Sequence, residues 1–162
     1  MDWNKLTRSY IVWDDIQIKG FFGDGENEYR WLSNFYNSTV WFEGLQYPSV
    51  ECAYQASKVD EDNRKIFTTC TSAESKKLWK TFPSIYTKES WDLVKFDIMS
   101  GIIFNKFLRN KGLRQKLIET GDKYLEETNH WRDQFWGVDY KTGIGENNLG
   151  KILMRNRMYW RI

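Results

Sequence analysis

The pattern of apolar and polar positions divides the chain into a short β-rich beginning and a longer helical remainder. Residues 9–22 alternate and are rich in β-branched and aromatic side chains, with Asp14 and Asp15 separating two short runs. This pattern predicts two short strands that could pair as a hairpin. A further strand is expected at residues 40–42, and the periodicity becomes helical from Asp60 onward.

The helical part carries start and stop signals. Thr71 and Glu74 have the spacing of a capping box, which predicts a helix through Trp79. Ser90 is the expected N-cap of a long helix, and Gly121 suits the left-handed end of the next one. The apolar stripe of the long helix should form the central core: Val94, Ile98, Ile102 and either Phe104 or Phe107.

Length and composition limit the possible classes of protein. The 162 residues are near the usual size of one domain, so we expect a single domain over residues 1–162. The formal net charge of +2 neither requires nor excludes an anionic partner. Nine tryptophans are more than a small core needs, which predicts that some of them line a cavity for a flat ligand.

Cysteine and histidine are sparse. Cys52 and Cys70 are too few and too widely spaced for a disulfide framework or a zinc site, and His130 is the only histidine. We therefore expect neither a metal nor a cofactor.

The N-terminus lacks an apolar signal core, and no run approaches the ~20 apolar residues of a membrane span. These features predict a cytoplasmic protein, in the host cytoplasm if the chain is viral, with no membrane association.

One short helix gathers polar groups. Pro48 and Ser49 predict that it begins near Val50. Positions i, i+3, i+4 and i+7 share one helix face, and here they are Glu51, Tyr54, Gln55 and Lys58. Either this face is solvated and carries no chemistry, or it presents a carboxylate, an amide and an amine to a ligand.

Two other segments have two interpretations each. Ser33 and Asn34 lie among aromatic residues, where they form a plain turn or donate to a ribose or phosphate. Residues 126–150 concentrate acids, tryptophans, asparagines and glycines ahead of an expected helix from about Asn148 to Arg157. They form either a glycine-rich connection or a phosphate cradle at the helix N-terminus.

The order of the motifs resembles one family. LSNFY occupies residues 32–36, and G-x-x-YPSVE-x-AYQA-x-K occupies residues 44–58. Further along are WD (91–92), IM (98–99), KF-x-x-N (106–110), L-x-x-TGD (117–122), D-x-x-WG (133–137) and, near residues 145–157, G-x-N-x-LG-x-x-LM-x-x-R. Together they resemble the NADAR superfamily, small enzymes related to a bacterial N-glycosidase that acts on riboflavin-pathway intermediates.

The resemblance implies a compact, mainly α-helical domain. With the helical pattern, it leads us to predict a mainly α fold: a compact single-domain helical bundle with a small N-terminal β region. It also implies a hydrolase that cleaves the N-glycosidic bond between a base or amine and a phosphorylated ribose. Some members are similar to hydrolases that remove ADP-ribose from guanine in nucleic acid.

The resemblance also implies roles for individual residues. Glu51 falls where the family has its glutamate, Lys58 falls on its helix lysine, and Asp133 begins D-x-x-WG. Breaking the C1′–N bond leaves positive charge on the sugar, so Glu51 is assigned to the sugar side and Asp133 to support or proton delivery. Lys58 is either a nucleophile that forms a Schiff base or a cationic phosphate contact. The expected substrate-binding residues are Ser33, Asn34, Trp91, Trp136, Asn148 and Arg157.

Two departures from the family pattern stand out. The family usually has histidine where this chain has Cys52, and that histidine is either catalytic or only a packing partner of the glutamate. Trp79 and Lys80 stand where the family usually has Gly-Arg.

Three functions stay open. The leading hypothesis is an ADP-ribosyl-guanine hydrolase acting on nucleic acid, and the second is a small-molecule N-glycosidase of riboflavin-biosynthesis intermediates. The third is a non-catalytic ADP-ribose-binding module. The partner is therefore ADP-ribosylated nucleic acid or a phosphoribosyl small molecule, and no obligate protein partner is expected. The first hypothesis is favoured if a basic face forms from Lys5, Lys106, Arg109, Lys111, Arg114 and Lys116.

Overall fold

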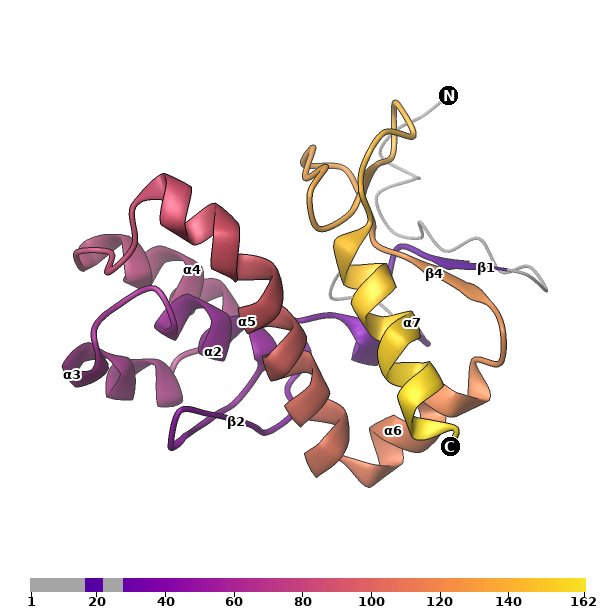
Figure 1. Cartoon of the computed structure of the whole chain (residues 1–162), viewed down its shortest axis with the longest axis horizontal. Coiled ribbons are helices and arrows are strands. Elements are labelled where there is room, and N and C mark those ends of the chain that lie inside the picture. The colour runs from indigo at the N-terminus through magenta and orange to yellow at the C-terminus, as the bar shows by residue number, and fades with distance from the viewer. Residues whose placement is uncertain (1–16, 22–27) are drawn as a thin grey trace. The chain divides into compact units, whose positions relative to one another are not determined.

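The computed structural model describes residues 17–21 and 28–162 (Figure 1). They form two compact units: residues 34–111, and the described residues up to Ser33 together with residues 112–162. The prediction of one domain over the whole chain stays a prediction. The first half of the predicted N-terminal hairpin lies outside the described residues.

The unit of residues 34–111 begins with a β-hairpin. β2 (Val40–Phe42) and β3 (Leu45–Tyr47) are antiparallel, and Glu43 and Gly44 turn the chain between them with φ of 44° and 81°. Two positive φ values in a two-residue loop match the twist of the flanking strands, which explains the glycine. The helices that follow are α2 (Val50–Ala56), α3 (Glu61–Arg64), α4 (Ser72–Leu78) and α5 (Lys88–Arg109), with 3₁₀ turns η2 (Lys65–Thr68) and η3 (Trp79–Thr81).

Two of the three predicted helix starts in this unit are confirmed. The Ser49 hydroxyl accepts a bond from the Cys52 N–H at 3.1 Å, and Thr71 and Glu74 form the reciprocal capping box. Ser90 is wrong as a cap, because α5 begins three residues earlier. Thr87 caps it, accepting from the Ser90 N–H at 3.2 Å. Thr87 and Ser90 both carry a hydroxyl that can cap a helix. Because the residues between them are able to adopt helical geometry, the helix begins at the earlier of the two.

The core of this unit lies between α2 and its neighbours. Every residue of α2 is buried, and α2 packs against α4 and α5. α5 buries Ile102 and Phe107, as the apolar stripe predicted, together with Met99 and Ile103. Val94 and Ile98, which the stripe also placed in the core, are only half-buried. Because this short helix is buried on all sides, its polar residues Glu51 and Gln55 also lie inside the protein.

The second unit consists of short strands and helices. Its helical elements are η1 (Arg30–Leu32), α6 (Lys111–Glu119) and α7 (Asn148–Trp160). β1 (Gln17–Lys19) pairs in parallel with β4 (Tyr124–Glu126), and β5 (Thr128–Asn129) pairs in parallel with β6 (Val138–Asp139).

Helix α7 lies along β4 (Figure 1). A side chain at Gly150 would overlap the Leu125 carbonyl oxygen, so glycine permits this close approach. Gly121 adopts φ of 61° after α6, which confirms the predicted left-handed helix end. Among the described residues, no helix is long and apolar enough to cross a membrane.

The predicted fold class is wrong. The chain is not a mainly α helical bundle with β structure confined to its beginning, because its described part is mixed α/β and contains three two-stranded sheets. Strands of two or three residues are too short to show alternation. In the parallel pair of β1 and β4, moreover, the two strands come from opposite ends of the sequence, so no local pattern indicates that they pair.

Candidate active site

A chain of hydrogen bonds runs along one face of α2 and just beyond its end. The Gln55 side-chain N–H₂ donates to Glu51 Oε1 at 2.7 Å, and Lys58 Nζ donates to Gln55 Oε1 at 2.7 Å. Glu51 is only 6% exposed, and Gln55 is buried as well. The spacing in the sequence predicted this shared face. Its burial argues against a solvated face without chemistry, because charged side chains seldom lie inside a protein without specific partners.

The two end groups determine the orientation of the Gln55 amide. A carboxylate only accepts hydrogen bonds and an ammonium only donates them, so the amide N–H₂ must face Glu51 and the amide oxygen must face Lys58. Gln55 therefore couples the two charged groups and holds the Glu51 carboxylate in one orientation.

Three aromatic rings surround the Lys58 ammonium. Nζ lies 4.4 Å from the centroid of Trp79, 5.0 Å from that of Tyr54 and 5.3 Å from that of Trp91. Trp91 also packs against Tyr54 and Tyr86, with ring centroids 5.2 and 5.3 Å apart. Cations are attracted to aromatic faces at these distances, so the rings form a cage for a charged head group.

Burial sets the acidity of this amine. It lowers the pKa of Lys58 from its ordinary value to about 8, against an opposing effect of Glu51. The positive charges of Lys76 and Lys80 lower the pKa of Lys58 further. Lys58 therefore changes its charge near neutral pH, where an ordinary lysine does not.

Asn34 is joined to the start of α2. Its carbonyl oxygen accepts from the Glu51 N–H at 3.0 Å, and its side-chain amide contacts Met99 Sδ at 3.4 Å. The loop that carries Asn34 is thus attached directly to the residue that carries the carboxylate. The structure brings Asn34, Glu51, Lys58 and Trp91 together in this unit.

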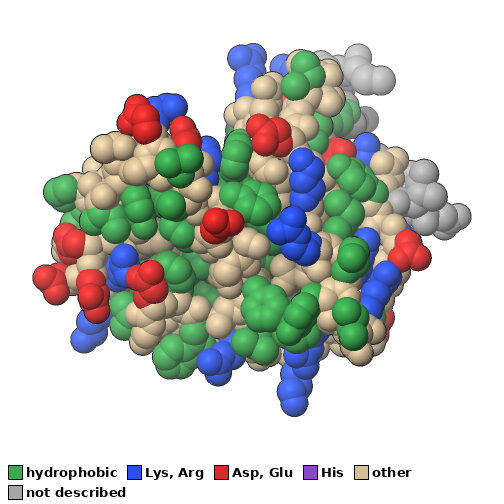
Figure 2. All heavy atoms as spheres, in the orientation of Figure 1, with side chains coloured by type: hydrophobic (Ala, Val, Ile, Leu, Met, Phe, Trp, Pro, Cys, Tyr) green, Lys and Arg blue, Asp and Glu red, His purple; other side chains and the backbone are tan. Residues whose placement is uncertain are grey.

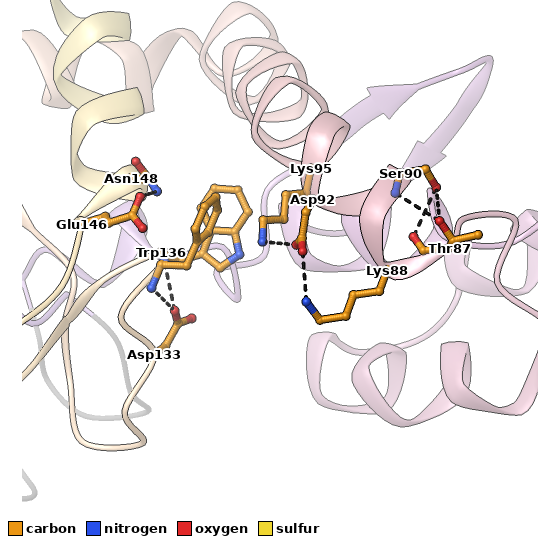
Figure 3. A network of polar contacts seen from close by, with 10 residues as sticks. Thr87, Lys88, Ser90, Asp92, Lys95, Asp133, Trp136, Glu146 and Asn148 are labelled. Atoms are coloured by element: carbon orange, nitrogen blue, oxygen red, sulfur yellow. Dashed lines mark hydrogen bonds and ion pairs between the residues drawn. The ribbon is translucent and has the colours of Figure 1, made fainter.

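The first turns of α5 carry the aspartate of the WD motif. Asp92 is exposed and accepts hydrogen bonds from Lys95 at 2.6 Å and Lys88 at 3.3 Å (Figure 3). The bond from Lys95, together with that from Lys88, lowers the pKa of Asp92. Asp92 is therefore a charged surface partner of two lysines.

In the other unit, Asp133 organises its own turn. Asp133 Oδ1 accepts from the N–H groups of Phe135 at 3.0 Å and Trp136 at 2.9 Å (Figure 3). Its backbone is held in turn by the side chain of Asn129. By these bonds the Asp133 carboxylate stabilises the turn that follows it. Proton delivery by Asp133 stays a prediction.

The remaining predicted binding residues also belong to this unit. Asn148 donates to Glu146 Oε2 at 2.9 Å (Figure 3), and Arg157 donates to Thr120 Oγ1 and to the Lys123 carbonyl, both at 2.8 Å. Ser33 is buried at the end of η1. Arg157 is buried, and these two hydrogen bonds within the protein stabilise its guanidinium there. Substrate contacts of Ser33, Trp136, Asn148 and Arg157 stay predictions.

Three residues that act on Lys58 were not predicted from the sequence. Trp79 covers its ammonium, and Lys76 and Lys80 contribute nearby positive charge. They come from α4 and η3, so helical periodicity within α2 could not reveal them. Trp79 and Lys80 stand at a departure from the family pattern, which was the only signal in the sequence.

The residues expected to form a basic face do not all lie on the surface. Lys106 is 1% exposed, with Nζ over the rings of Tyr36 and Phe107, and Lys5 lies outside the described residues. Arg114 lies over the Trp160 ring. On the visible face of residues 34–111, at the left of Figure 2, acidic and basic side chains are interspersed. The visible face of residues 34–111 therefore gives little support to a broad nucleic-acid interface.

Comparison with known proteins points to one family. The profile of the NADAR domain matches residues 20–161. An N-glycosidase of Nostoc punctiforme is 33% identical over 133 residues, which cover 80% of this chain and 84% of that protein. N-glycosidase YbiA of Escherichia coli is 30% identical over 133 residues, which cover 81% of each chain.

A longer relative and a solved structure agree with this match. A riboflavin biosynthesis protein of Vibrio vulnificus is 33% identical over 139 residues, or 85% of this chain, but the chain spans only 37% of the length of that protein. The NMR structure of E. coli YbiA matches with a TM-score of 0.76 and 27% identity, over 95% of this chain and 90% of that one.

Proposed function

The chain belongs to the NADAR family, and on that premise we propose that it is an N-glycosidase that cleaves the bond between a base or amine and a phosphorylated ribose. One observation carries the proposal: the buried carboxylate of Glu51 is oriented by Gln55 and linked through it to Lys58. The relatives named N-glycosidase support the same class of reaction.

Glu51 supplies the negative charge that this reaction needs. As the C1′–N bond breaks, positive charge develops on C1′ and the ring oxygen, and a fixed carboxylate beside the sugar stabilises it. The same carboxylate can accept a proton from the water that attacks C1′. A carboxylate held by the Gln55 amide needs little reorganisation when the charge appears.

Lys58 acts as a cation in this proposal. The aromatic cage and the Gln55 oxygen both stabilise the ammonium, which then attracts a substrate phosphate. The alternative role, attack on C1′ by the neutral amine, requires the deprotonated form that appears above pH 8. The pH dependence of the reaction separates the two roles.

For the substrate, we propose ADP-ribose attached to guanine in nucleic acid. Lys76 and Lys80 lie near enough to Lys58 to affect its pKa, so three amines share one region of the unit. A cluster of this kind favours a substrate with several phosphate charges over one with a single phosphate. Of the nearby rings, Tyr54 is buried, but Trp79 and Trp91 are partly exposed and offer surfaces on which a base can stack.

A riboflavin-biosynthesis intermediate is the second candidate. The observation in its favour is the name of the Vibrio relative, a riboflavin biosynthesis protein. Such a phosphoribosyl compound contains the same kind of bond and requires the same Glu51 chemistry. It requires no contact with a polyanion.

The experiment offers both substrates to the purified protein. Release of ADP-ribose from an ADP-ribosylated guanine in a DNA oligonucleotide is measured beside release of ribose phosphate from the riboflavin precursors. We expect ADP-ribose release, with affinity for the oligonucleotide that falls between low and moderate salt. Turnover of only the precursors would favour the second candidate. Tight binding of ADP-ribose without release from either substrate would favour a non-catalytic binding module and overturn the proposal.

A further inference from the structure

Two thiols that the proposed reaction does not use lie in contact. Cys52 is part of α2, and Cys70 directly precedes Thr71, the N-cap of α4. Their sulfur atoms are 3.9 Å apart, and Cys52 Sγ lies 3.3 Å from the Cys70 carbonyl oxygen. Both are free thiols.

The surrounding bonds hold the two segments at this distance. The hydroxyls of Ser49 and Ser72 share a hydrogen bond of 2.7 Å, and Ser72 also bonds to the Phe35 carbonyl oxygen at 3.2 Å. The first turn of α2 is thereby held against the first turn of α4. The contact between the two sulfur atoms is therefore part of the packing of this unit.

The two thiols differ in their access to solvent. Cys52 is completely buried, whereas Cys70 is partly exposed. Cys70 lines a hollow in the surface together with Ile66, Thr69, Glu74, Lys77, Leu78 and Thr81. An oxidant in solution therefore meets Cys70 first, with Cys52 directly behind it.

We propose that Cys52 and Cys70 are a redox modification site, at which a peroxide converts the two thiols into a disulfide. Hydrogen peroxide first oxidises the Cys70 thiol to a sulfenic acid and is itself reduced to water. The Cys52 sulfur then attacks the Cys70 sulfur, the S–O bond breaks, and the oxygen leaves as a second water that carries the proton of the Cys52 thiol. Closing the bond moves the sulfur atoms together by about 2 Å, and Cys70 lies in the connection between η2 and α4, outside either helix.

The protein environment makes this reaction slow in the absence of a strong oxidant. Burial, together with the neighbouring Cys52, raises the pKa of Cys70 to about 12, so little thiolate is present at neutral pH. Because the thiolate is the reactive form, the reaction requires excess peroxide, and a higher pH should speed it. The disulfide would then link α2, which carries Glu51, to the start of α4, and it would restrict the unfolded chain.

The test uses the full chain treated with hydrogen peroxide and digested with trypsin without a reductant. Cleavage after Arg30, Lys58, Lys65 and Lys76 separates the two cysteines, so a disulfide joins peptides 31–58 and 66–76. We expect this linked pair in the peroxide-treated protein, and we expect it to disappear on reduction with dithiothreitol and in Cys70→Ser. In Cys52→Ser, Cys70 should gain oxygen without forming a link.

A second measurement concerns the folded protein. The thermal unfolding midpoint of the wild type should rise after peroxide treatment and return after reduction, and that of Cys70→Ser should not rise. The proposal is overturned if Cys70 of the wild type gains oxygen without a link, if the link joins two chains, or if neither cysteine reacts under conditions that oxidise methionine. These readouts require no turnover, so they are independent of the proposed function.

Discussion

The charge of Lys58 governs what this residue can do. Its ammonium is held by the Gln55 oxygen and by three rings, yet burial lowers its pKa to about 8. The residue therefore lies close to the point at which it loses its charge. Each of its two candidate roles requires a different charge state, so the pH dependence of the reaction separates them.

We predict that kcat/KM falls as the pH rises above about 8, because the cationic form of Lys58 is lost there. Lys58→Arg should keep much of the activity and lose this decline, since arginine stays protonated. Lys58→Met should be impaired at every pH. A pH–rate profile of the three proteins checks this.

The opposite profile would favour the nucleophilic role of Lys58. In that case kcat/KM would rise through the same pH range, Lys58→Arg would be inactive, and borohydride would trap a covalent adduct with the opened ribose.

The sequence was informative about residues that share a helix and uninformative about those that do not. The spacing of Glu51, Gln55 and Lys58 predicted their common face, because the helical repeat is known in advance, and Lys58 keeps this position although α2 ends two residues before it. Trp79 and Lys76 reach the same ammonium from other elements. Their positions depend on how α4 packs against α2, which no local pattern specifies.

At the scale of elements, local signals gave the right helix starts where a cap had one candidate. Ser49 and Thr71 were predicted correctly, whereas Ser90 was predicted as the cap of α5 and Thr87, three residues earlier, caps it. Strand pairing was the larger failure. β1 pairs with β4 across most of the chain, and three-residue strands carry too few positions to indicate a partner.

The close approach of α7 to β4 gives a prediction about one glycine. Gly150→Ala should reduce the free energy of unfolding by about 1–3 kcal/mol, because the added methyl group would overlap the Leu125 carbonyl oxygen. Gly101→Ala in α5 is the matched control. No atom lies within 4 Å of its added Cβ, so the variant should be stabilised by about 0.5–1 kcal/mol. Urea unfolding of both variants checks this, and equal effects at the two positions would contradict the packing described for α7.

At the scale of the whole molecule, one buried amine links stability to pH. Burial lowers the pKa of Lys106 to about 7 from an ordinary value of 10.5. Below pH 7 the folded and unfolded chains both carry the proton, and the folded chain bears the full penalty of a buried charge. Between 7 and 10.5 the unfolded chain binds more protons than the folded one, so stability rises with pH. Lys58 contributes with the same sign above about pH 8, so a variant is needed to isolate Lys106.

We predict that Lys106→Met is more stable than the wild type at about pH 6, and that the difference shrinks as the pH rises toward about 10. The difference at low pH should reach a few kcal/mol, since each unit of pKa shift corresponds to about 1.4 kcal/mol. Denaturant unfolding at a series of pH values measures it. A difference that does not change with pH would show that the charge of Lys106 is not the cause.

The central claim is that the Glu51 carboxylate stabilises a ribosyl cation as the leaving nitrogen departs. The most direct test compares turnover and binding in Glu51→Gln, which keeps the shape of the side chain and an oxygen for the Gln55 amide but removes the charge. We predict that release of ADP-ribose falls by at least about 100-fold while ADP-ribose binds nearly as before, and that Glu61→Gln, at an exposed position of α3, leaves both unchanged. Turnover in Glu51→Gln equal to that of the wild type would contradict the account.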